Sequence, residues 1–215
     1  MKRVVISVEG QTEEKFVKEV LYPYFINKGI FIDPILLGGY KTYNRIKKEI
    51  LSIAKRKNCI ATTMYDFYGL SKINNFAGID FDNLNAINSI EKVKNIENSF
   101  KHDLNLHNFI PYIQIHEFEA FMFIDSYITS ENLPKCNKLA IISYIDAIRN
   151  EFDNNPESIN DSYQTAPSKR ILNKYRQYEK ITDGINITKA LGIQKILDSC
   201  AHFKEWIEKI EQFQL

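Results

Sequence analysis

Short apolar runs that alternate with amphipathic stretches constrain the fold of this chain most. Four runs are rich in β-branched and aromatic residues, as buried strands are; they cover residues 4–8, 31–37, 59–65 and 109–115. Helical patterns lie between them, over residues 12–28, 43–57 and 83–104. Strands that alternate with helices pair in parallel, because each helix returns the chain to the same end of the sheet. The sequence therefore predicts an α/β fold with a four-stranded parallel sheet flanked by helices. The order we expect is 2-1-3-4, in which strands 1, 3 and 4 are neighbours.

The second half of the chain is expected to be helical. Thr12 is the expected N-cap of the first helix, and residues 67–82 read as a loop. Later helices are expected at about 118–125, 137–150, 167–176 and 188–213. This pattern predicts an α/β core over residues 1–125 and a helical C-terminal region over residues 126–215, packed on the core.

Composition and motif searches exclude several classes of protein. Lys plus Arg total 28 and Asp plus Glu total 27, so the formal net charge of +1 argues against partners bound through bulk charge. Cys59, Cys136 and Cys200 form no close pair and no zinc-ligand spacing. No apolar stretch approaches the ~20 residues of a membrane span, and no signal peptide is visible. We therefore expect a cytoplasmic protein without a membrane partner, and the sequence leaves a homo-oligomer open.

Three of the four expected strands end in a carboxylic acid. Glu9 follows the first strand, Asp66 the third and Glu117 the fourth. Ligands of open α/β sheets bind outside the carboxyl ends of the strands, so these acids are expected to converge on one crevice. Glu13, in the first turn of the following helix, can reach the same place. Glu119 shares the face of Glu117 if the strand continues and points elsewhere if a helix begins.

Clustered carboxylates are unfavourable without a cation, because like charges raise each other's pKa. Mg²⁺ or Mn²⁺ bound by carboxylate oxygens removes that penalty. The alternative is that each acid is an idle surface residue at a strand end or helix start. Convergence of Glu9, Asp66 and Glu117 at equivalent positions makes the metal site as strong as this alternative, with Glu13 and Glu119 as further candidate ligands.

Several motifs resemble known families. Residues 8–14, Val-Glu-Gly-Gln-Thr-Glu-Glu, resemble the Glu-Gly-x-Thr-Glu opening of TOPRIM-fold proteins, especially the OLD-type nucleases. Residues 66–69, Asp-Phe-Tyr-Gly, resemble an element of the bacterial domain of unknown function 4276. Three further motifs resemble that group in the same order, at residues 116–120, 166–170 and 200–206. The resemblance covers nearly the whole chain and implies a TOPRIM-like fold.

The resemblance also implies roles for individual residues. Glu9, followed by Gly10, matches the TOPRIM acid that acts as general acid/base or metal ligand, and Glu13 matches the second acid of the OLD-type opening. Asp66 matches the first Asp of the TOPRIM Asp-x-Asp pair, but Tyr68 stands at the second position. Glu117 or Glu119 is the candidate for the missing ligand. The group often occurs beside ATPases in bacterial defence operons, which implies an ATPase partner.

Residues around the acids supply further candidates. Ser168, Lys169 and Arg170 follow Pro167 at an expected helix start, where backbone N–H groups and cations suit a phosphate; an N-cap with solvated basic residues is the alternative. His116 is a candidate ligand or proton shuttle, or a hydrogen-bonded boundary residue. The aromatic residues beside Asp66 could stack on a base or belong to the core; they are Tyr65, Phe67 and Tyr68.

Three functions fit these features. The first is metal-dependent hydrolysis of nucleic acid, DNA or RNA, in which Glu9, Asp66 and Glu117 hold Mg²⁺ or Mn²⁺ and Lys169 and Arg170 neutralise phosphate. The second is a non-catalytic accessory or adaptor subunit of an ATPase complex. The third is phosphotransfer to a small molecule. Walker loops and Ser-His-Asp motifs are not visible, which argues against an ATPase or a serine hydrolase.

Overall fold

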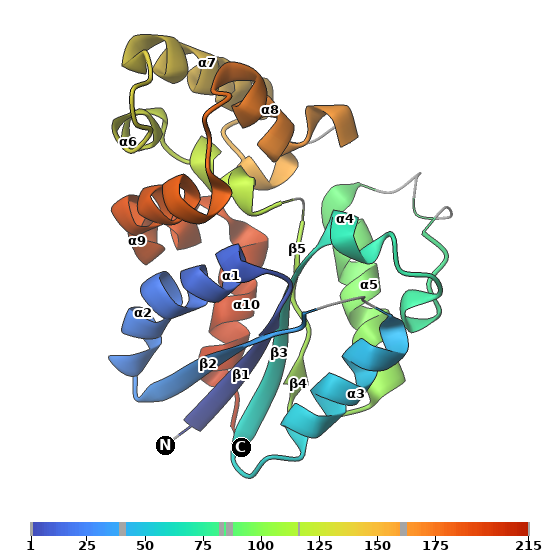
Figure 1. Ribbon diagram of the computed structural model, residues 1–215. Coiled ribbons are helices and arrows are strands. Elements are labelled where there is room, and N and C mark those ends of the chain that lie inside the picture. Colours follow the sequence, from blue (N-terminus) through green and yellow to red (C-terminus); the bar gives the residue numbers. More distant parts are fainter. Residues whose placement is uncertain are drawn as a thin grey trace. The chain divides into compact units, whose positions relative to one another are not determined.

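The computed structural model describes residues 2–38, 42–81, 84, 88–115, 117–159 and 163–214 (Figure 1). The chain forms two compact units. Unit 1 is Met1–Ile115 together with Glu205–Leu215, and unit 2 is His116–Lys204. The units therefore divide at residue 115, where a division at residue 125 was expected, and the last residues of the chain belong to unit 1.

A parallel sheet forms the centre of unit 1. Its strands are β1 (Lys2–Val8), β2 (Ile30–Leu36), β3 (Cys59–Asp66), β4 (Phe109–Ile110) and β5 (Ile113–Gln114). The order is β2-β1-β3-β4, with β5 also on β3, and every pair is parallel. This confirms the predicted order 2-1-3-4 and the α/β class.

The expected fourth strand is interrupted. Pro111 has no N–H to give to a ladder, so the strand breaks into β4 and β5 there. Across the gap, the Thr63 hydroxyl donates to Tyr112 O at 2.9 Å and accepts from Tyr112 N at 3.0 Å. A side chain thus replaces the missing ladder bonds and keeps the chain on β3.

Helices cover both faces of this sheet (Figure 1). One face packs against α3 (Tyr43–Ala54) and α5 (Ser89–Leu104), through a core that includes Val5, Ala61 and Phe100. On the other face lie α1, η1 and α2, which run continuously over residues 11–26, and α10 (Ala201–Gln212). The elements are α1 (Gln11–Phe16), η1 (Val17–Leu21) and α2 (Tyr22–Ile26).

Three details of unit 1 correct the expectations. The first helix begins at Gln11 with Gly10 as its N-cap, and Thr12 is buried within the first turn. The expected loop contains two short helices, α4 (Phe67–Leu70) and η2 (Phe76–Gly78). The helix expected from residue 83 is described only from Ser89, where the Asn88 side chain accepts from Glu91 N; residues 82, 83 and 85–87 lie outside the described ranges.

The final helix is fixed firmly to unit 1. Trp206 stacks on Tyr112 with ring centroids 4.3 Å apart, and its Nε1 donates to Thr62 Oγ1 at 2.8 Å. The Lys2 ammonium donates to the carbonyl oxygens of Ile210, Glu211 and Phe213 at 2.8–3.0 Å. The Lys2 side chain, at the start of β1, therefore caps the C-terminal end of α10.

Unit 2 is helical over its described residues. Its longer elements are η4 (Phe118–Phe123), α6 (Ser126–Glu131), α7 (Lys138–Glu151), α8 (Pro167–Lys174), η7 (Lys180–Gly184) and α9 (Ile185–Ser199). The single helix expected over residues 188–213 is two helices that meet at Cys200. Buried Glu157 explains the break, since its carboxylate accepts from His202 N and Phe203 N at 3.0 Å each and caps the new helix.

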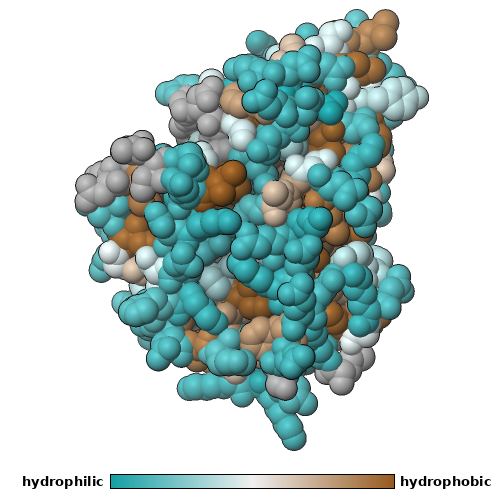
Figure 2. All heavy atoms as spheres, turned by 180° about the vertical axis from the view of Figure 1, so that it is seen from behind, coloured by the Kyte–Doolittle hydropathy of each residue, from teal (hydrophilic) through white to brown (hydrophobic). Residues whose placement is uncertain are grey.

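On the side seen in Figure 2, hydrophilic side chains predominate, and apolar side chains form smaller groups between them. Across the described ranges, no helix combines the length and the apolar character needed to cross a bilayer.

Candidate functional site

The structure brings Glu9 and Asp66 together at the carboxyl end of the unit 1 sheet. Val8 of β1 pairs with Met64 of β3, so the two strands end side by side. Glu9 follows β1 directly, and its Oε2 accepts a hydrogen bond from Asp66 N at 3.2 Å. Both acids thus lie at the edge where ligands of open α/β sheets bind.

A tight turn after β3 holds both carboxylates. Asp66 is the N-cap of α4, and its Oδ1 accepts from Gly69 N at 2.5 Å. A Cβ atom at Gly69 would lie 2.4 and 2.6 Å from the two carboxylate oxygens of Glu9. The Glu9 carboxylate therefore rests against the bare Cα of Gly69, and the absence of a side chain at this position permits the close approach. Sequence reasoning quoted Gly69 only as part of a motif; its spacing of three residues from an N-cap Asp was the available signal.

Glu13 turns back toward the same end of β1. It lies in the first turn of α1, is buried, and its Oε2 would be 3.1 Å from a Cβ at Gly10. Gly10 thus lets a second carboxylate approach the backbone next to Glu9. Each of the two glycines thus lies close to one carboxylate: Gly10 to that of Glu13, and Gly69 to that of Glu9.

A buried polar chain lies in the sheet behind Glu9. Tyr65 is 1% exposed, and its hydroxyl lies 2.6 Å from Ser7 Oγ, which in turn contacts the Glu49 carboxylate. Burial raises the pKa of Tyr65, the hydrogen bond between Tyr65 and Ser7 opposes this rise, and the charges of Glu49 and Glu9 add to it. Tyr65 is therefore a core residue that cannot stack on a nucleic-acid base, and Phe67 packs on Phe81 at 6.2 Å between ring centroids.

The donor set of unit 1 suits a hard cation. Glu9 and Asp66 offer only oxygen, which Mg²⁺ and Mn²⁺ prefer, and each has one oxygen engaged by a backbone N–H. Within the residues that the structure describes, no group of three or more His, Cys, Asp or Glu side chains is arranged to hold a metal ion. Mg²⁺ can be held by one or two carboxylates when water and substrate complete its shell, and a metal ion at Glu9 and Asp66 stays a prediction.

In unit 2, Glu117 meets the start of α8. It is the N-cap of η4, and its Oε2 accepts from Ser168 N at 2.9 Å. The predicted helix start at Pro167 is correct. However, one of the N–H groups that was predicted to donate to a phosphate, that of Ser168, donates to the Glu117 carboxylate.

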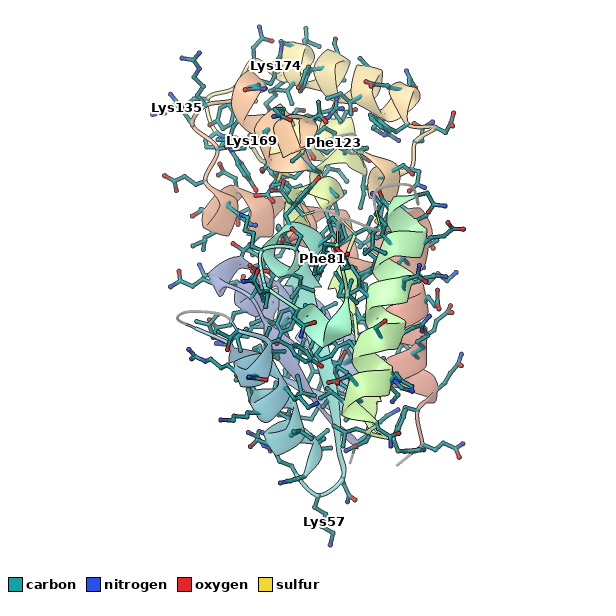
Figure 3. The ribbon with its side chains drawn as sticks, turned by 90° about the vertical axis from the view of Figure 1, so that its right-hand side faces the viewer. Lys57, Phe81, Phe123, Lys135, Lys169 and Lys174 are labelled. Carbon is teal, nitrogen blue, oxygen red and sulfur yellow. The ribbon has the colours of Figure 1, made fainter. Side chains whose placement is uncertain are left out.

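The two basic residues of this motif differ in their surroundings. Arg170 is built into the fold: its Nε donates to Thr165 O at 2.7 Å, its guanidinium lies 5.2 Å from the Phe152 ring centroid, and its backbone oxygen accepts from the Tyr144 hydroxyl. Lys169 is half-buried on the same turn (Figure 3). Arg170 therefore has a structural explanation in the fold, and a phosphate role for Lys169 and Arg170 stays a prediction.

Glu119 is paired with a lysine of its own unit. It is 2% exposed, and its Oε2 lies 3.4 Å from Lys180 Nζ. Burial raises the pKa of Glu119, Lys180 opposes the rise and Glu117 adds to it. Among the described residues, neither Glu119 Oε2 nor the buried Tyr178 hydroxyl has a hydrogen-bond partner. Because η4 begins at Phe118, the helical alternative holds, and Glu119 does not share a strand face with Glu117. Participation of Glu117 and Glu119 in the Glu9 metal site stays a prediction.

A pH titration tests this assignment of Glu119. Since its folded pKa lies above the ordinary value of about 4.3, the folded state holds more protons than the unfolded state between those two values. The free energy of unfolding contributed by Glu119 must therefore fall as pH rises through that window. Urea unfolding from pH 4 to pH 7 should show Glu119→Gln gaining stability relative to wild type as pH rises. A difference that does not change with pH would contradict the assignment.

The predicted site residues therefore lie in two groups. Unit 1 holds Glu9, Glu13, Asp66 and the half-buried Tyr68, and unit 2 holds Glu117, Glu119 and the turn 168–170. His116 lies outside the described residues. Sequence reasoning missed Glu49, Tyr178 and Lys180, which show no motif and are joined to the candidate residues only by folding.

The protein is an α/β protein with a parallel sheet, and two neighbouring strands of this sheet, β1 and β3, end at the acids Glu9 and Asp66. The chain belongs to the family described as domain of unknown function DUF4276, which matches residues 8–211. A solved structure similar to it is the C-terminal region of the OLD protein of Xanthomonas campestris pv. campestris, at 16% sequence identity and a TM-score of 0.44, covering 98% of this chain and 95% of that one. None of the curated proteins matches the chain.

Proposed function

We propose that this protein hydrolyses phosphodiester bonds of nucleic acid with a Mg²⁺ or Mn²⁺ ion held by Glu9 and Asp66. The observation that carries the proposal is the hydrogen-bonded pair of acids at the ends of β1 and β3, each held by a backbone N–H. A paired, immobilised set of carboxylates is a feature of a metal site more than of idle surface acids.

The residues have separate tasks in this proposal. Asp66 N fixes Glu9, and Gly69 N fixes Asp66. Glu9 and Asp66, with Glu13 nearby, would hold the cation. The bound ion supplies charge stabilisation and lowers the pKa of a water molecule. In unit 2, Lys169 binds a phosphate of the substrate.

Glutamine and asparagine substitutions test the proposal. Glu9→Gln and Asp66→Asn should each reduce metal-dependent cleavage of DNA or RNA by about 100-fold or more, because a charge that is removed from such a site is not replaced by solvent. Millimolar Mg²⁺ or Mn²⁺ should raise the melting temperature of wild type, since a ligand of the folded state stabilises it by mass action, and Glu9→Gln should abolish the rise.

Glu14→Gln is the matched control. Glu14 directly follows Glu13 in α1, but its carboxylate forms an ion pair with Lys18 at 2.6 Å on the helix surface. This variant should retain both cleavage and the metal-dependent rise. Equal rises in wild type and Glu9→Gln would show that the ion binds elsewhere, and loss of activity in all three variants would show that the effect is not specific.

A second function is favoured by one observation. Tyr68 stands where the resemblance places a second acid, and no three-ligand group forms among the described side chains. We infer from this the alternative of a non-catalytic subunit that works beside an ATPase. No metal-dependent rise in the melting temperature of wild type, together with binding to an ATPase from the same operon, would select it. An ATPase partner is part of the proposal in either case.

A further inference from the structure

A hollow in unit 2 collects positive charge outside the residues discussed above. Its volume is about 400 Å³, and it lies between the start of α7 and the segment after α8. Lys135, Lys174 and Arg176 line it, and Figure 3 labels the first two. The other lining residues carry no acid; they are Cys136, Asn137, Ala140, Ile141, Tyr175 and Gln177.

Contacts within unit 2 build the walls of this hollow. The Tyr175 hydroxyl donates to Pro134 O, which ties the segment after α8 to the segment before α7. Asn137 caps α7 by accepting from Ala140 N at 3.1 Å. The Lys174 ammonium lies 5.4 Å from the centroid of the Tyr144 ring. The cations are therefore carried by two segments that are fixed to each other.

Among the residues that the structure describes, no carboxylate lines the hollow, although Glu179 and Asp183 lie near enough to Tyr175 to influence its charge. Neighbouring cations of the unit are paired with acids, as Lys138 is with Glu131 at 2.6 Å and Lys195 with Asp125 at 2.5 Å. Within the described ranges, Lys135, Lys174 and Arg176 form no ion pair. Three like charges around one hollow repel each other, and an anion removes the repulsion. The N-terminus of α7, a helix of 14 residues, adds partial positive charge beside Asn137.

We propose that this hollow binds a phosphate group. Arg and Lys are the side chains that bind phosphate oxygens, and the volume falls within the range of small-molecule sites, about 300–1,000 Å³, so a sugar attached to the phosphate also fits. The phosphate can belong to a nucleic-acid strand or to a free phosphorylated small molecule. A nucleic-acid strand as the source of the phosphate rests on the proposed function. The phosphate site itself does not depend on that function.

The position of the hollow favours a strand. α8 carries Lys169 near its first turn and Lys174 at its last residue. Lys169 and Lys174 are five residues apart, which is about 7.5 Å along the helix axis and about the length of two nucleotides at about 3.4 Å each along a strand. A strand that passes α8 can therefore place two neighbouring phosphates at these two lysines.

The test uses the full chain with three exposed cations replaced, in the variant Lys135→Gln, Lys174→Gln, Arg176→Gln. The control variant is Lys189→Gln, Lys195→Gln, Lys204→Gln, which removes the same charge from α9 and α10. Binding of inorganic phosphate, followed by NMR, should weaken about tenfold or more in the first variant and stay near wild type in the control. Circular dichroism and thermal melts confirm that both variants are folded.

A second arm identifies the source of the phosphate. If a strand occupies the hollow, single-stranded DNA should bind the first variant more weakly, with a salt slope lower by about 0.7 for each phosphate that the protein no longer neutralises. If the variant no longer binds phosphate but binds DNA with unchanged affinity and salt slope, the ligand is a free phosphorylated molecule. Equal phosphate affinity in wild type, test and control variants would overturn the site. Cleavage activity is measured separately with Glu9→Gln, so failure of the proposed function does not decide this result.

Discussion

We expect Trp206→Ala to lower the free energy of unfolding of this protein by about 3–5 kcal/mol, the range measured when large aromatic residues are truncated in a core. The side chain is 2% exposed, stacks on Tyr112 and donates from Nε1 to Thr62 Oγ1. Its removal leaves a cavity over the sheet and an unsatisfied partner at Thr62. Since typical domains are stable by only about 5–15 kcal/mol, the variant should be near the limit of folding at 37 °C.

Trp206→Phe separates the two contributions. Phenylalanine keeps an aromatic ring against Tyr112 but cannot donate to Thr62, so the loss should be nearer about 1–2 kcal/mol. Urea unfolding followed by circular dichroism measures both variants, because Trp206 is the only tryptophan of the chain and its fluorescence disappears with it. An alanine variant within about 1 kcal/mol of wild type would show that α10 is not part of the stable core.

Gly69→Ala should remove activity with little loss of stability. An added Cβ lies 2.4 Å from one Glu9 carboxylate oxygen, far closer than atoms of this kind approach. The Glu9 carboxylate is the free end of a flexible side chain, so it can move away at a cost of about 1 kcal/mol or less. Its displacement breaks the bond to Asp66 N and should reduce metal-dependent cleavage by about 100-fold, as Glu9→Gln does.

Gly10→Ala is the comparison for this prediction. Its Cβ would be 3.1 Å from Glu13 Oε2, a milder contact with the other carboxylate. This variant should retain more activity than Gly69→Ala. If Gly69→Ala unfolds the protein, the Glu9 carboxylate does not move away as expected. If the variant keeps full activity and the full metal-dependent rise in melting temperature, the close approach of Glu9 to residue 69 is not needed for function.

The strand order was predictable because alternation of strands and helices leaves few parallel topologies, and because the ends of β1 and β3 each carry an acid. The pairing of Glu9 with Asp66 follows from that order alone. Glu119 was less predictable, since its direction depends on whether a strand or a 3-10 helix follows Glu117. The break of the last helix at Cys200 was also hidden, because Glu157 caps it from 45 residues earlier in the chain. Periodicity describes one segment at a time and cannot show such long-range caps.

Unit 1 is built from two separate segments of the chain, Met1–Ile115 and Glu205–Leu215. This arrangement has a consequence for synthesis on the ribosome. The sheet face around Thr62 and Tyr112 is complete in sequence once residue 115 has emerged, but its cover, α10, emerges only after residues 116–204. At about 5–20 residues per second, that interval lasts several seconds. During this time an apolar face of a parallel sheet is open to other nascent chains and to chaperones, so the yield of folded protein in the cell depends on the speed with which the last helix arrives.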